Sequence, residues 1–113
     1  MSMQVINLEK GMPKSDEAVM KLKLELMTLR RIGVDSVKII HGYGSTGKGG
    51  KIRLKTRKYL RNLQNEGKIK FFCPGELFGP FETDGRKAIE LEPALRNDSD
   101  WARSNDGITI VIL

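Results

Sequence analysis

Five glycines between residues 42 and 50 most constrain what this chain can fold into. The stretch from His41 to Lys51 reads HGYGSTGKGGK. A short apolar run, Val37–Ile40, precedes it, and apolar residues recur at helical spacing after it. A glycine loop between a strand and a helix exposes backbone N–H groups at the positive end of the helix. The sequence therefore predicts a strand–loop–helix junction that can hold an anion.

Two nucleotide-binding motifs fit this loop only in part. Gly42 to Lys48 matches G-x-x-x-x-G-K, but Gly49 stands where a Ser or Thr would bind magnesium. Gly42, Gly44 and Gly47 match G-x-G-x-x-G, but residues 67–72 hold no acid for a ribose. Both a triphosphate site and a dinucleotide site are therefore disfavoured.

Hydrophobic periodicity predicts alternating strands and helices. A helix should begin near Ser15, bury Ala18, Leu22, Leu26 and Leu29 on one face, and end at Gly33. A second helix should cover about residues 51–66, and a short one Arg86–Leu91. Strands are predicted at Gln4–Leu8, Val37–Ile40, about 68–73 and Ile108–Leu113. Two strands joined by a helix favour parallel pairing, with both main helices on one sheet.

The positive charge is concentrated in one third of the chain. The net charge is +6, but residues 41–70 carry nine Lys or Arg against one acid, and residues 71–113 carry four against eight. A basic block of this density favours contact with nucleic acid. No apolar run is long enough to span a membrane and no secretory signal is visible. With one cysteine, Cys73, the chain is expected to be cytoplasmic.

The loop and its flanks resemble the signature of the Smr (small MutS-related) domain family. Val37–Gly44, Ser45-Thr46-Gly47 and Ile52-Arg53 are similar to its pattern His-Gly-x-Gly-(x)-Thr-Gly-x-x-(Leu/Ile)-Arg, and Asn105–Leu113 is similar to its closing turn and strand. The resemblance implies an α/β fold, a two-layer sandwich of a roughly four-stranded mixed sheet with two main helices on one face, in β-α-β-α-β-β order. The length of the chain suits a single such domain over residues 1–113, and the stretch at about 74–103 departs from the family pattern as an insertion-like loop. The resemblance also implies DNA or RNA binding and, in several members, nicking endonuclease activity.

The first strand departs from the family pattern. That strand usually ends in Leu-Asp-Leu-His-Gly, and its Asp and His are linked to cleavage. Here Asn7 stands for the acid and Glu9 for the histidine, with one extra residue before Gly11. Asn7 cannot act as a base, whereas Glu9 can if it faces the loop. Binding therefore carries over better than catalysis.

We accordingly predict a nucleic-acid-binding domain that uses the glycine loop and the following helix. His41 and Glu9 are the candidate catalytic residues, with Mg²⁺ or Mn²⁺ required only if the chain is a nickase; no other cofactor and no dedicated metal site are predicted. The alternative is a catalytically inactive protein-interaction or scaffold domain. The predicted nucleic-acid contacts are Gly42, Tyr43, Gly44, Ser45, Thr46, Gly47, Lys48, Lys51, Arg53 and Arg57.

Aromatic residues outside the loop are expected to pack in the core rather than stack on bases. This applies to Phe71, Phe72, Phe78 and Phe81, which flank a predicted strand. Tyr43 lies inside the glycine loop, so its role as an exposed stacking residue or a packing residue stays open.

Overall fold

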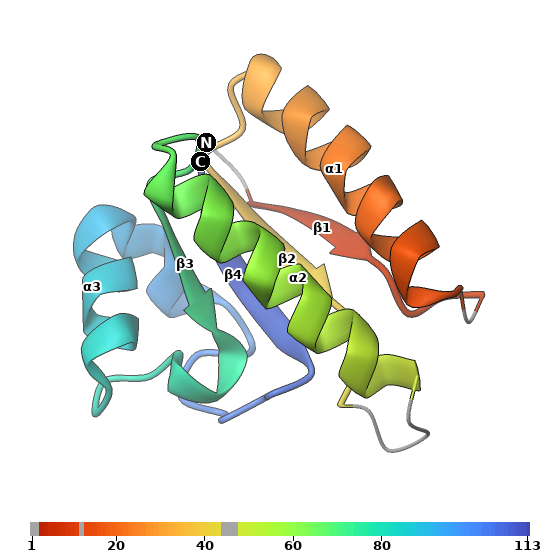
Figure 1. The fold of residues 1–113 in the computed structure, drawn as a ribbon. Helices are drawn as coiled ribbons and strands as arrows, with labels where there is room; N and C mark the ends of the chain where they lie inside the picture. The colour runs from red at the N-terminus through yellow and green to blue at the C-terminus, as the bar shows by residue number, and fades with distance from the viewer. Residues whose placement is uncertain (1–2, 12, 44–47) are drawn as a thin grey trace.

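The computed structural model describes residues 3–11, 13–43 and 48–113, excluding the side chains of residues 48 and 49. The elements follow in the order strand, helix, strand, helix, strand, helix, strand, with two short 3-10 turns (Figure 1). They are β1 (Met3–Asn7), α1 (Ser15–Arg31), β2 (Ser36–Ile40), α2 (Lys48–Asn65), β3 (Phe71–Pro74), η1 (Gly75–Leu77), α3 (Thr83–Leu91), η2 (Pro93–Asn97) and β4 (Ile108–Ile112). The predicted order of main elements is confirmed.

The four strands form one mixed sheet in the order β1-β2-β4-β3. β1 pairs in parallel with β2, as the intervening helix predicted, and β4 runs antiparallel to both β2 and β3. The last strand of the chain therefore lies in the middle of the sheet. All five of its residues are buried, which agrees with their strong β propensity.

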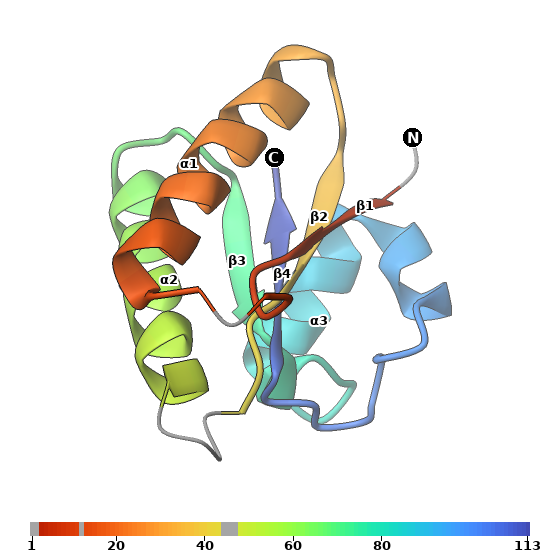
Figure 2. The same ribbon diagram turned by 90° about the vertical axis from the view of Figure 1, so that its right-hand side faces the viewer.

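The helices α1 and α2 lie together on one face of the sheet, and α3 lies on the other (Figure 2). Alternate residues of the strands supply the two faces: Val37, Ile39 and Val111 pack beneath α1 and α2, while Ile108 and Ile110 pack toward α3. The α/β class, the mixed four-stranded sheet and the two main helices on one face are confirmed. The segment after β3 adds a third helix that covers the opposite face.

This added segment is held to the sheet by a buried cation. Lys38, on β2, places its ammonium 2.8 Å from Asp98 and 2.6 Å from Asp100. Burial lowers the pKa of Lys38, but its hydrogen bonds to the two carboxylates outweigh burial, so the pKa is raised overall. Lys38 is thus charged and ties the chain beyond η2 to the central part of the sheet.

The aromatic residues divide between core and surface. Phe71 and Phe78 are buried, Phe72 is half-buried, and Trp101 meets Phe78 edge-on with ring centroids 5.0 Å apart. The expectation of packing is wrong for Phe81, which is 92% exposed. Phe81 lies in the turn between Gly79-Pro80 and α3, where Pro80 and Glu82 are exposed as well, so this turn does not reach the core.

No helix in the described ranges is both long enough and apolar enough to cross a lipid bilayer.

Candidate nucleic-acid interface

The junction after β2 is closed by the backbone of the turn that precedes β4. The N–H groups of His41 and Gly42 both donate to the carbonyl of Gly107, each at 3.0 Å. Gly42 has a φ of +82°, a conformation that L side chains rarely adopt, and a Cβ at this position would collide with the Glu9 carboxylate. These two N–H groups, which the sequence placed in the anion-binding loop, are therefore already occupied.

His41 is fully buried and both of its ring nitrogens have hydrogen-bond partners. Nδ1 lies 3.0 Å from the carbonyl of Gly42, and Nε2 lies 2.8 Å from Oγ1 of Thr109 on β4. A carbonyl can only accept, so Nδ1 carries the proton and Nε2 accepts from the threonine hydroxyl. That hydroxyl in turn accepts from Nε of Arg57 on α2, at 3.2 Å. A chain of hydrogen bonds thus runs from α2 through β4 to the end of β2.

The buried site lowers the pKa of His41 from its ordinary 6.5 to about 4. Burial is the main cause because it disfavours the charged imidazolium, and the positive charges of Arg57 and Arg53 act in the same direction. The hydrogen bond to Gly42 opposes the shift. His41 is consequently neutral at pH 7, in agreement with the hydrogen-bond pattern.

Two of the predicted phosphate ligands on α2 are paired with acids. Arg57 makes two hydrogen bonds to Glu76, of 2.8 and 2.7 Å, and a third to the carbonyl of Ile108 at 3.3 Å. Arg53 lies 3.3 Å from Asp106. Burial raises the pKa of Glu76, but its hydrogen bonds with Arg57 outweigh this and hold the pKa below its usual value. The Arg57 pair is the better shielded, since the Arg57 side chain is only 13% exposed.

Asn7 and Glu9 lie at the turn that follows β1. Oδ1 of Asn7 accepts from the N–H groups of Glu9 and Lys10, both at 2.9 Å, so this side chain closes the turn. The carboxylate of Glu9 lies over Gly42, beside His41 in the sequence. Both ring nitrogens of His41 are bonded to other groups, so no hydrogen bond joins the two candidate catalytic side chains.

The exposed side of α2 carries cations without acidic partners. Lys51, Lys58 and Arg61 are exposed, and none has an ion-pair partner in the part of the chain that the structure describes. They recur seven and three residues apart, so they follow one stripe of the helix. We call these three residues the basic stripe. Leu54, 66% exposed, lies in the same stripe.

A groove of about 410 Å³ between α1 and α2 adjoins the basic stripe. Lys58 belongs to both, and the groove also contains Lys23, whose ammonium lies 5.2 Å from the centre of the Tyr59 ring. Lys55, on α2, pairs with Asp16, on α1, at 2.5 Å. Three lysines and one aromatic ring thus line a channel beside the free cations.

The predicted site residues fall into three groups. Glu9, His41, Gly42, Arg53 and Arg57 gather around the end of β2 and the first turns of α2. Lys51 belongs to the exposed basic stripe. Tyr43 is 58% exposed, and its ring lies beside Gly107. Gly44, Ser45, Thr46, Gly47 and the side chain of Lys48 lie outside the described residues.

Three residues that sequence reasoning did not select complete the network: Glu76, Asp106 and Thr109. They follow Arg57 in the chain by 19, 49 and 52 positions. Asp106 and Thr109 lie in the closing segment that is similar to the Smr family, but no motif links any of the three residues to α2. No group of three or more His, Cys, Asp or Glu that could hold a metal ion occurs within the described ranges.

These features define the class of the protein as an α/β domain with a mixed β1-β2-β4-β3 sheet, whose strand-to-helix junction meets a basic helix face. Among solved structures, the chain is similar to the crystal structure of the Smr domain of Thermus thermophilus MutS2. The match has a TM-score of 0.57 and 18% sequence identity, and covers 97% of this chain and 96% of that one. The predicted resemblance is confirmed at the level of the fold. No protein-family model and no curated protein matches the sequence.

Proposed function

We propose that this chain is a nucleic-acid-binding domain whose contact surface is the basic stripe together with the groove between α1 and α2. The observation that carries the proposal is that Lys51, Lys58 and Arg61 are exposed and lack acidic partners among the described residues, on one helix face. Unpaired cations are the groups that release counterions from a phosphate backbone. The fold shared with a domain of a MutS2 protein supports the same ligand class by analogy.

The buried network serves to position this surface. Arg57 joins α2 to Glu76 and to β4, and through Thr109 it reaches His41. Since His41 is neutral and enclosed, and both of its nitrogens are bonded, we assign it a positioning role at the start of the glycine loop. Binding without cleavage is therefore the proposed function.

A binding series with matched charge variants tests the proposal. Fluorescence anisotropy would be measured with duplex DNA, branched DNA and structured RNA over several salt concentrations. Lys58→Gln/Arg61→Gln should weaken binding about tenfold or more and reduce the salt slope by about 2, since each lost phosphate contact removes roughly 0.9. Arg96→Gln/Arg103→Gln is the control, because it removes the same charge from exposed positions beyond α3.

Equal losses of affinity in the two double variants would mean that net charge alone governs binding. That result would refute the basic stripe as the contact surface. Absence of binding to all three polyanions would refute nucleic-acid binding and favour the protein-interaction alternative. A nicking assay on supercoiled plasmid with Mg²⁺ or Mn²⁺ tests the assignment of binding alone. Cleavage lost in both Glu9→Gln and His41→Gln would overturn it.

A further inference from the structure

The outer face of α1 carries a line of exposed apolar side chains. Met20, Leu24 and Met27 are 56%, 66% and 41% exposed, while Ala18, Leu22 and Leu26 on the same helix are buried. The exposed three are spaced by four and three residues, so they form one stripe on the side of the helix opposite the core. An apolar stripe on a polar helix marks a contact surface.

Opposite charges stand at the two ends of this stripe. Glu17 precedes Leu24 by seven residues and Arg31 follows it by seven, which places them about 10 Å from it in opposite directions along the helix. Both are exposed, and neither has an ion-pair partner within residues 3–11, 13–43 and 48–113. The stripe is thus acidic at its start, apolar in the middle and basic at its end.

We propose that this face of α1 binds a second copy of the chain, with the two helices antiparallel and a two-fold axis passing near Leu24. In that arrangement Leu24 meets Leu24 of the second copy, and Glu17 of each copy meets Arg31 of the other. A surface with an acid at one end and a base at the other is complementary to itself in the antiparallel sense only. A two-fold contact requires this self-complementarity.

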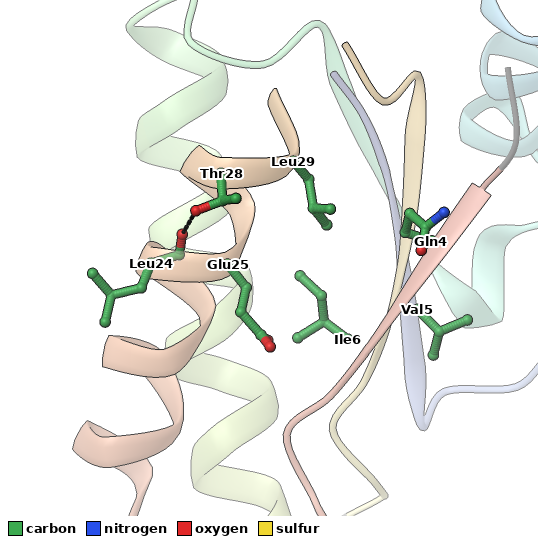
Figure 3. A pocket seen from close by; sticks show the side chains of 7 residues that line it. All are labelled: Gln4, Val5, Ile6, Leu24, Glu25, Thr28 and Leu29. Carbon is green, nitrogen blue, oxygen red and sulfur yellow. Dashed lines mark hydrogen bonds between the residues drawn. The ribbon is translucent and has the colours of Figure 1, made fainter. Parts of the chain in front are cut away.

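The stripe borders two grooves, because Leu24 also lines a groove between α1 and the free edge of β1, and Met20 also lines the groove between α1 and α2. In the groove beside β1, of about 410 Å³, Glu25 points toward Ile6 (Figure 3). Leu24 points away from the sheet in the same view. A partner on the outer stripe therefore need not bury the carboxylate of Glu25.

The small size of the surface indicates a weak contact. One face of a 17-residue helix is smaller than the roughly 800 Å² per partner that stable complexes bury. We therefore expect a reversible dimer that is populated in the upper micromolar range. This proposal does not depend on the proposed function, and its test uses protein without nucleic acid.

Sedimentation velocity between about 10 µM and 1 mM is the first measurement, with the dimer fraction expected to rise over this range. Glu17→Lys and Arg31→Glu should each abolish dimerisation because they create like-charge contacts across the axis. The double variant Glu17→Lys/Arg31→Glu should restore it, since both pairs are then reversed. A monomer at all concentrations, or a double variant that stays monomeric, would overturn the proposal.

Cross-linking locates the axis independently. Only a residue on a two-fold axis meets itself, so Leu24→Cys should oxidise to a disulfide-linked dimer faster than Glu17→Cys or Arg31→Cys. The native Cys73 is fully buried and should not contribute. Equal rates at the three positions, or faster linking at either end, would show that another face is used.

Discussion

His41 is a titrating group held in its neutral form by the fold. Its pKa is about 4 in the folded chain against an ordinary 6.5, so the unfolded chain takes up a proton first as the pH falls. The free energy of unfolding should therefore decrease between pH 6.5 and pH 4. Between pH 7 and pH 5 the expected loss is about 2 kcal/mol.

Urea unfolding at the two pH values measures this loss directly. His41 is the only histidine in the chain, so no other side chain of ordinary pKa titrates in this window. His41→Gln is the control: whatever its absolute stability, its free energy of unfolding should be nearly flat from pH 7 to pH 5. An equally steep decline in this variant would assign the effect to another group.

Among the acids that pair with cations of α2, Glu76 should be the one whose removal lowers the free energy of unfolding most. Glu76→Gln removes the negative charge and one of the two oxygens that accept from Arg57, and should lower the free energy of unfolding by about 1–3 kcal/mol at pH 7. Because the pKa of Glu76 is lowered on folding, its contribution is present above pH 4.5 and is lost as the pH falls through the lowered pKa. The difference between the two proteins should therefore disappear in acid, as thermal unfolding can show.

An exposed pair provides the comparison for Glu76. Glu66 lies 3.5 Å from Lys68, and both side chains are more than half exposed. Glu66→Gln should change stability by less than about 0.5 kcal/mol. Comparable losses in the two variants would mean that the Arg57 network adds little beyond an ordinary surface pair.

At the scale of elements, a glycine lets α3 pack closely against the turn that precedes it. A Cβ on Gly85, in the first turn of α3, would collide with the backbone of Gly79 and Leu77. Gly85→Ala should therefore displace α3 and cost more than about 2 kcal/mol. Gly33→Ala meets no atom within 4 Å and incurs only the strain of its φ of +87°, about 1 kcal/mol.

Chemical denaturation of the two glycine variants separates collision from backbone strain. Near-UV circular dichroism reports whether the packing of Trp101 on Phe78, beside this segment, is lost together with stability. Equal costs for Gly85→Ala and Gly33→Ala would contradict tight packing of α3 against the turn before it.

The main elements could be predicted because their causes are local. Apolar residues at helical spacing mark α1, and Gly33 and Gly67, which adopt positive φ, mark the chain just beyond α1 and α2. The predicted strand at about 68–73 is observed at Phe71–Pro74, and the short helix predicted at Arg86–Leu91 begins three residues earlier. Such differences at element ends are ordinary for signals read from the sequence.

The remaining features depend on contacts between distant parts of the chain. The central place of β4 requires the pairing of Val37 with Val111, 74 residues apart. His41 bonds to Thr109, and the charge of Arg57 is compensated by Glu76; no local pattern predicts either of these pairings. Sequence reasoning therefore identified the loop and its cations, but not which cations the fold leaves free.

At the scale of the whole molecule, the acidic part of the chain compensates cations from the rest. Asp98 and Asp100 pair with Lys38, Glu76 pairs with Arg57, and Asp106 pairs with Arg53. The excess of nine basic residues over one acid in residues 41–70 is therefore partly neutralised in the folded protein. A polyanion therefore meets only the cations that remain unpaired. Among the described residues, the basic stripe is the largest group of these.

Removing Asp106, the acidic partner of Arg53, should consequently increase affinity for nucleic acid. The ion pair with Asp106 is long, at 3.3 Å, and both side chains are partly exposed, so releasing it costs at most about 1 kcal/mol. Asp106→Asn should tighten binding up to about fivefold and steepen the salt slope by roughly 0.9, because Arg53 then gains a phosphate.

Glu90→Gln is the control, since it removes one negative charge from an exposed position on α3, across the sheet. If net charge alone governed binding, the two variants would tighten it equally. If the released Arg53 binds a phosphate, the slope of the salt dependence should steepen in Asp106→Asn and not in Glu90→Gln.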